Sequence, residues 1–243
     1  MTDVHRFPYR ARLREMLARH GALRTLGTLG KGAFEIARDY LPSRRRQRYG
    51  DIDFDWDRRV DTTWSNIPLR TRIRELLAGR AYQPSDPVIF DEIMSRLSID
   101  CRQFTFLDLG SGKGRALLLA SDYPFRRIVG VELLPELHAI AQKNVCQYRN
   151  ERQQCRDFEL HCCDARQYAL PREPLVIFLF EPFPEDILRD VMLRVEQSLR
   201  EAPRQVFLVY QNPVAEPVIA EFQIFRKIAG TIQYAIFDTL NHS

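Results

Sequence analysis

The chain has 243 residues, of which 45% are apolar, enough for one ordinary domain core and an additional segment. No stretch approaches the roughly 18 consecutive apolar residues that a membrane helix needs, and the first residues lack the apolar run of a secretion signal. The five cysteines are odd in number and show no Cys-x-x-Cys spacing, so we expect reduced thiols and no metal site. These features predict a cytoplasmic protein without a membrane span.

The formal charge of +4 is unevenly distributed. Residues 1–80 hold 18 Lys and Arg against 10 Asp and Glu, a net +8, whereas residues 81–243 hold 18 against 22, a net −4. A solvated, arginine-rich helix face is one interpretation of the basic part. The alternative is a basic arm that binds an acidic partner, such as nucleic acid or an anionic lipid. The change of charge divides the chain into an N-terminal extension, 1–80, and a domain, 81–243.

The extension is predicted to be mainly helical. Apolar residues at helical spacing predict helices within 7–41 and 68–78. Between them, the segment 49–64 alternates acids with Ile52, Phe54 and Trp56. This alternation is typical of a short edge strand or an extended clip, and a solvated linker with an aromatic anchor is the alternative.

From Tyr82 onwards, strands and helices alternate. Ser85 or Asp86 is placed to cap a helix over 88–97. Strands are predicted at 104–109, 127–132, 157–163, 175–180 and 206–210, helices at 112–121, 135–148 and 184–199, and a closing hairpin at 222–225 and 233–237. This order predicts an α/β fold with a doubly wound, mostly parallel sheet and right-handed crossovers.

A glycine-rich turn follows the first predicted strand. Residues 104–114 read FTFLDLGSGKG, with Gly110, Gly112 and Gly114 at every second position. Such a turn presents backbone N–H groups to a cofactor, and glycine permits a positive φ and a close approach of the ligand. A dinucleotide fingerprint would need glycine in place of Arg115, and a Walker P-loop would need glycine in place of Leu107. Both of these sites are therefore disfavoured.

The run FLDLGSGKG, followed by GVE and later by CDA, resembles class I S-adenosylmethionine-dependent methyltransferases over roughly 82–240. The resemblance implies a seven-strand Rossmann-like sheet of order 3-2-1-4-5-7-6 and S-adenosyl-L-methionine as cofactor. It also implies that an acid at each of three strand ends binds the cofactor: Asp108 its ammonium, Glu132 its ribose hydroxyls and Asp164 its adenine amino group. Taken singly, such an acid is a helix cap or a surface residue. The remaining cofactor-binding candidates are Gly110, Ser111, Gly112, Gly114, Leu133 and Ala165, whereas Lys113 is interpreted as a solvated loop residue.

The fourth predicted strand ends in Glu181-Pro182-Phe183. In the family this position faces the transferable methyl group, and members that methylate amines often carry Asn/Asp-Pro-Pro-aromatic there. As the catalytic candidates, Glu181 would orient an amine and accept its proton, and Phe183 would pack beside a cation. Alternatively, Glu181 caps the helix that begins at 184.

A second resemblance concerns Tyr82-Gln83-Pro84-Ser85-Asp86-Pro87, which is similar to the loop that covers the cofactor in protein-lysine methyltransferases of the disruptor-of-telomeric-silencing type. It implies that Tyr82 covers the cofactor; a hydrophobic staple is the alternative. The segment 57–64 resembles bacterial proteins of this group, which would bring Asp61 and Thr62 to the mouth of the site. Residues 210–213, at the end of the fifth predicted strand, are expected to line an acceptor channel or simply to turn the chain.

Together, these resemblances predict an N-methyltransferase whose acceptor is a protein, with lysine as one candidate, or a small molecule. Small-molecule O-methylation is an alternative. A catalytically silent scaffold that binds an acidic partner through its basic arm is another.

Overall fold

The computed structural model of the protein describes residues 52–63, 82–181 and 183–239, together with residues 14, 15, 17–19, 21–27, 30, 34 and 71. The described residues between 14 and 34 are helical, in agreement with prediction. The helix predicted over 68–78 lies outside the described residues except for Thr71. None of the described helices combines the length and the apolar character needed to cross a membrane.

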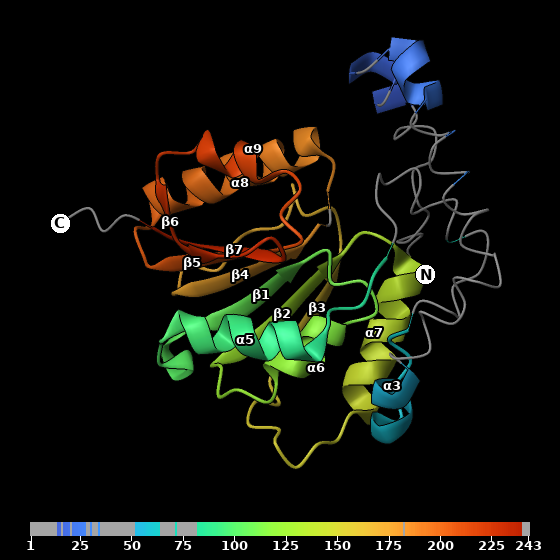
Figure 1. The fold of residues 1–243 in the computed structure, drawn as a ribbon, viewed down its shortest axis with the longest axis vertical. Helices are drawn as coiled ribbons and strands as arrows, with labels where there is room; N and C mark the ends of the chain where they lie inside the picture. The colour runs from blue at the N-terminus through green and yellow to red at the C-terminus, as the bar shows by residue number, and fades with distance from the viewer. Residues whose placement is uncertain are drawn as a thin grey trace, which may run out of the picture.

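The domain is built on a seven-strand sheet of order β3-β2-β1-β4-β5-β7-β6, which confirms the predicted fold class and strand order (Figure 1). β1 to β5 run parallel, and β7 is antiparallel to both β5 and β6. The strands are β1 (Thr105–Leu109), β2 (Arg127–Glu132), β3 (Phe158–Cys162), β4 (Leu175–Phe180), β5 (Val206–Gln211), β6 (Phe225–Gly230) and β7 (Tyr234–Thr239).

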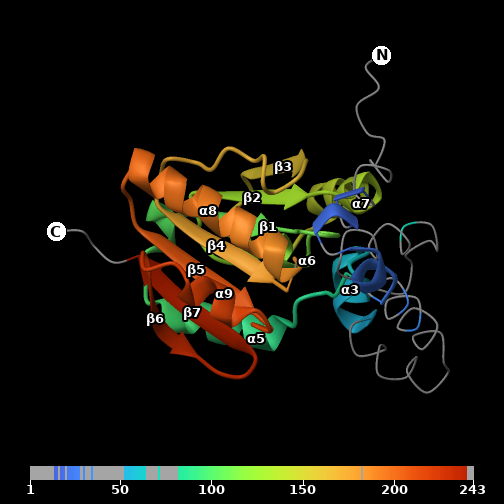
Figure 2. The same cartoon turned by 90° about the horizontal axis from the view of Figure 1, so that it is seen from above.

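Helices cover both faces of this sheet (Figures 1 and 2). One face carries α5 (Pro87–Leu97), α6 (Arg115–Ala120) and α7 (Pro135–Gln147), and the other carries α8 (Glu185–Glu201) and α9 (Glu216–Ala220); a short 3-10 helix, η3 (Cys101–Gln103), precedes β1. Because side chains alternate along a strand, Phe178 of β4 packs against α5, and its neighbour Leu179 packs against the α8 side. Two apolar cores therefore hold the sheet between the helical layers.

One predicted strand is misplaced. The apolar run 222–225 was expected to form the sixth strand, but Phe222 lies just after α9 and is buried in the core on the α8 side. β6 instead begins at Phe225, and its residues are half-buried or exposed, as is usual for the edge of a sheet. The apolar run thus marks residues that pack in the core and not a strand. An edge strand is exposed on one side, so β6 forms without a continuous apolar run.

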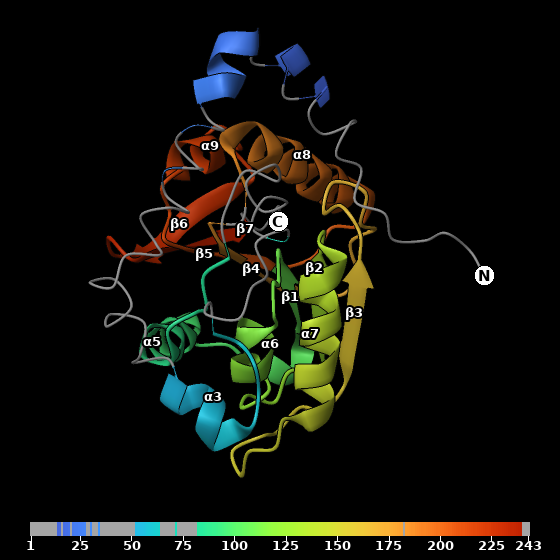
Figure 3. The same ribbon diagram turned by 90° about the vertical axis from the view of Figure 1, so that its right-hand side faces the viewer.

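The segment expected to be an edge strand contains a helix, α3 (Ile52–Arg58), on the same side of the sheet as α5 and α6 (Figure 3). Phe54 is buried in the core on the α5 side, and the guanidinium groups of Arg58 and Arg115 lie 4.2 and 4.1 Å from the centre of its ring. Asp55 is buried as well, whereas Trp56 is 82% exposed. In an edge strand, alternate residues would be buried, so Phe54 and Trp56 would share the buried face. The structure instead buries the neighbours Phe54 and Asp55 and exposes Trp56, so the predicted strand was wrong.

Candidate active site

A cavity opens where the parallel strands β1 to β4 end. Ligands of open α/β sheets bind at this edge because the loops after the parallel strands converge there. The predicted cofactor-binding and catalytic residues line the cavity except Gly114. Asp61, Thr62 and residues 210–213, which were also expected near the site, do not line it. Phe178, Phe180 and Ile187 also line the cavity, but their sequence signal is only apolar character, which does not distinguish a lining residue from a core residue.

The glycine turn forms the floor of this cavity. Gly110, Gly112 and Gly114 have φ values of 92°, 54° and 87°. A Cβ atom at Gly112 would lie 2.3 Å from ring atoms of Tyr82, so the ring of Tyr82 covers the turn directly. Gly114 instead faces α7, where its Cβ would lie 3.3 Å from that of Ala141, and its role is close packing of helices.

Two acids on neighbouring strands stand in the cavity wall. Asp108 and Glu132 are only 4% and 7% exposed. Glu132 accepts hydrogen bonds from the backbone N–H of Gly112 at 2.8 Å and of Leu134 at 2.7 Å, so this carboxylate is held against the glycine turn. Burial raises the pKa of Asp108 well above its ordinary value, and the charge of Glu132 raises it further. Burial also raises the pKa of Glu132, although hydrogen bonds from the backbone of Leu134, Gly112 and Leu133 oppose the shift.

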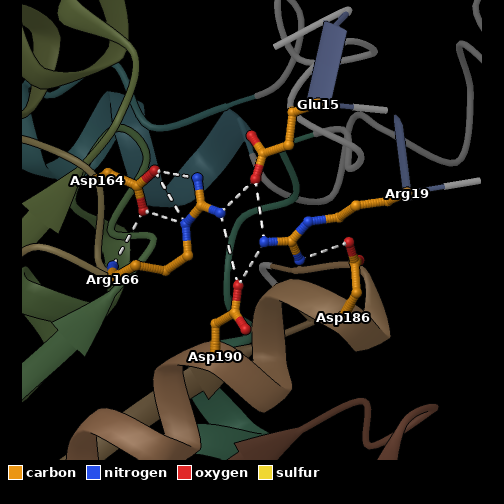
Figure 4. A network of polar contacts seen from close by, with 6 residues as sticks. All are labelled: Glu15, Arg19, Asp164, Arg166, Asp186 and Asp190. Carbon is orange, nitrogen blue, oxygen red and sulfur yellow. Dashed lines mark hydrogen bonds and ion pairs between the residues drawn. The ribbon is translucent and has the colours of Figure 1, made fainter. Parts of the chain in front are cut away.

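Asp164, the third acid of the prediction, lines the cavity but is already paired. Arg166 binds both of its carboxylate oxygens, with Nη2 2.7 Å from Oδ2 (Figure 4). Arg166 also contacts Glu15, from the N-terminal extension, and Asp190 of α8. The predicted contact between Asp164 and an adenine therefore concerns a carboxylate that Arg166 has oriented and partly neutralised.

The ends of β4 and β5 meet at the rim of the cavity. Glu181 and Asn212 both have left-handed backbones, with φ of 41° and 52°, which is uncommon for residues other than glycine. The side-chain amide of Asn212 donates a short hydrogen bond to the carboxylate of Glu181. Phe183 lies on the same rim, and α8 follows with Pro184 as its N-cap residue. Asn212, from the segment 210–213, thus contacts the predicted catalytic acid.

Lys113 was interpreted as a solvated loop residue, and the structure shows that this was wrong. Its side chain is fully buried, and Nζ donates to Oδ1 of Asp61 and to the carbonyl oxygen of Thr63, both at 2.7 Å. The prediction failed because both partners lie about 50 residues earlier in the chain, where local patterning cannot reveal them.

No protein-family model matches the chain. No curated protein matches it. Similar solved structures include the glycopeptide N-methyltransferase MtfA complexed with sinefungin, at a TM-score of 0.48 and 14% identity over 66% of this chain and 88% of that chain. A ribosomal protein L11 methylase from Lactobacillus delbrueckii subsp. bulgaricus has a TM-score of 0.46 and 17% identity, covering 66% and 81%. A methyltransferase from Methanococcus maripaludis, named as a putative S-adenosyl-L-methionine-dependent enzyme, has a TM-score of 0.48 and 17% identity, covering 63% and 84%. At these TM-scores and sequence identities, the similarity indicates neither the substrate nor the mechanism of this protein.

Proposed function

We propose that this protein is an S-adenosylmethionine-dependent methyltransferase that methylates an amine nitrogen. The observation that carries the proposal is the 2.8 Å hydrogen bond from the N–H of Gly112 to Glu132, which joins the turn after β1 and the acid at the end of β2 in one cavity wall. A bare backbone turn beside an acid on the neighbouring strand is the arrangement that binds the ribose of a nucleoside cofactor.

The chemistry of the wall fits this cofactor. Ser111 has a buried hydroxyl without a hydrogen-bond partner among the described residues, and it lines the cavity. A polar ligand would satisfy that hydroxyl, since buried polar groups in native proteins are almost always paired. Asp108 and Glu132 are buried carboxyl groups, and a ligand with positive charge beside them would favour their ionised forms. S-adenosylmethionine supplies a methyl group on a positively charged sulfur.

Each residue of the cavity wall would bind a different part of the cofactor. Asp108 would hold the ammonium group, and Glu132 would accept the ribose hydroxyls. Leu133 and Ala165 line the same cavity and would form an apolar face for the base. Tyr82 would cover the cofactor because its ring already lies on Gly112.

The rim supports an amine acceptor. The carboxylate of Glu181 is oriented by Asn212, so it can attract a cationic amine and take up its proton. Phe183 lies beside it, and an aromatic ring stabilises a nearby cation. A protein lysine has the required amine, and we propose it as the first acceptor to test.

Calorimetric titration with S-adenosylmethionine and with S-adenosylhomocysteine tests the cofactor site. We expect micromolar binding in the wild type, no binding in Gly112→Val, whose side chain would collide with Tyr82, and binding at least about tenfold weaker in Glu132→Ala. Gly27→Val is the matched control because a Cβ at Gly27 meets no atom within 4 Å. Binding by both site variants at the wild-type affinity would contradict the proposal.

Methyl-labelled cofactor added to cell lysate, with separation of protein, RNA and small-molecule fractions, tests the acceptor. We expect label on amines of the protein fraction. Glu181→Gln should lower turnover by about 100-fold or more without a change in cofactor affinity, as is typical for loss of an acid–base group. Glu185→Gln, an exposed position at the start of α8, is the control. Tight cofactor binding without label in any fraction would favour a catalytically silent scaffold.

A further inference from the structure

A short segment from the N-terminal extension lies on the glycine turn. Residues 60–63, which we call the strap, follow α3 directly. Lys113, inside the turn, donates to Asp61 and to the carbonyl oxygen of Thr63, both at 2.7 Å. The hydroxyl of Tyr82 donates to the carbonyl oxygen of Thr62 at 2.8 Å. The strap therefore contacts both the floor of the cavity and the ring that covers it.

Asp55 of α3 anchors the strap from the other side. Its carboxylate accepts the backbone N–H groups of Thr62 and Thr63, both at 2.7 Å, and the guanidinium of Arg115 at 3.3 Å. Nε of Arg115 donates to the hydroxyl of Thr62. Arg115 is the first residue of α6, is 1% exposed and lines the cavity.

A third contact fixes the backbone of the strap. Asn144 of α7 accepts the N–H of Asp61 at 2.8 Å and donates to its carbonyl oxygen at 2.8 Å. The same amide group donates to the carbonyl oxygen of Lys113 at 2.9 Å. The side chain of Asn144 thus forms hydrogen bonds to both the strap and the glycine turn, and a shift of either segment would break them.

Charge gives these contacts a consequence for binding. Arg115 in the cavity lining and Lys113 inside the glycine turn are buried cations, whereas the proposed ligand is itself a cation. Asp61 pairs with Lys113, and Asp55 pairs with Arg115. Without the strap, Lys113 would lose Asp61 and would oppose a cationic ligand, because an uncompensated buried charge is costly. With the strap in place, the charge of Lys113 is balanced by Asp61, and Tyr82 contacts Gly112 through its ring and the strap through its hydroxyl.

We propose that the strap positions Tyr82 over Gly112 and thereby sets the affinity of the cavity for its cofactor, with Asp55, Lys113 and Arg115 as positioning residues. The inference rests on the proposed function. Since the strap and the cofactor contact the same turn, their effects are reciprocal: binding of the cofactor stabilises the strap, and weakening the strap weakens binding.

The test measures binding of S-adenosylhomocysteine by calorimetry and amide hydrogen exchange of residues 60–63 in the full chain. We expect the ligand to slow exchange at Thr62 and Thr63. Asp55→Asn and Lys113→Met should weaken binding by about 5- to 100-fold, the usual range of coupling between sites. Asp53→Asn, an exposed position on the same helix, is the matched control and should bind as the wild type does.

Tyr82→Phe removes only the hydroxyl that reaches the strap and keeps the ring on Gly112, so it is the variant least able to disturb folding. It should weaken binding, and Lys113→Met should have less effect in this background than in the wild type, because both changes act through the strap. Wild-type affinity in Tyr82→Phe, or additive losses in the double variant, would overturn the inference alone. Failure of the wild type to bind the ligand would contradict the proposed function and this inference together.

Discussion

At the scale of single residues, Asp108 and Glu132 are the groups whose protonation matters most. Both carboxyl groups have a pKa raised above ordinary values of 3.8 and 4.5, chiefly because burial disfavours their charged forms. Between its ordinary pKa and its raised one, each group binds more protons in the folded protein than in the unfolded chain. The free energy of unfolding of the ligand-free protein should therefore fall as the pH rises through this window.

A cationic ligand reverses that preference, because positive charge beside a carboxylate favours its ionised form. We expect binding of S-adenosylmethionine to release protons and to strengthen as the pH rises through the raised pKa of Asp108. Calorimetry in two buffers with different ionisation enthalpies measures this release as a difference in apparent binding enthalpy. Asp108→Asn should reduce the difference, and Asp157→Asn, an exposed position, should not. Equal enthalpies in both buffers for the wild type would contradict the expectation.

At the scale of elements, the packing of α6 on β2 sets the shape of the turn. Gly130 lies in the middle of β2, and a Cβ there would be 2.6 Å from Cδ1 of Leu117 on α6 and 3.0 Å from Oγ of Ser111. The strand can approach the helix and the turn this closely only because Gly130 has no side chain. The same closeness places Ser111 in the wall of the cavity.

Gly130→Ala should therefore destabilise the protein by about 1–3 kcal/mol, the usual cost of overpacking a core. It should also weaken cofactor binding, because α6 cannot move without moving Ser111. Chemical denaturation measures the first effect and calorimetry the second. In Gly27→Ala the added methyl group meets open space, so the free energy of unfolding should change by no more than about 1 kcal/mol. A wild-type denaturation midpoint in Gly130→Ala would show that α6 has room to adjust.

At the scale of the whole molecule, the N-terminal extension contacts the domain in two described regions, which are α3 with the strap and the ion pairs of Glu15 and Arg19. The strap lies on the glycine turn, and Arg19 pairs with Asp186 and Asp190 of α8 at 3.2 and 2.9 Å (Figure 4). Part of the basic charge of the extension is thus used within the chain. Each partly exposed pair contributes no more than about 1 kcal/mol to stability, so this second contact is weaker than the buried strap. Binding of an acidic partner by the extension stays a prediction.

The sequence by itself determined the elements that depend on local pattern. β2 and β4 begin and end at the predicted residues, since strands buried on both faces are continuous apolar runs that end at a charged or glycine-rich turn. The start of α5 was also predictable, because Asp86 supplies a side-chain cap to Val88 and Ile89. The glycine turn followed from its spacing, and the resemblance to class I methyltransferases implied the strand-end acids, which a parallel sheet brings to a common edge.

Only the tertiary structure decided which charged residues are buried. Lys113, Arg115 and Asp55 look like surface residues in the sequence, because a charge is buried only when an opposite charge or a hydrogen-bond partner meets it. For Lys113 that partner lies 52 residues away, and for Arg115 it lies 60 residues away. The pairing of Glu181 with Asn212 depends likewise on two strands that meet only in the folded sheet. Long-range partners leave no periodic trace in a single sequence, so the strap and the rim of the cavity became visible only in three dimensions.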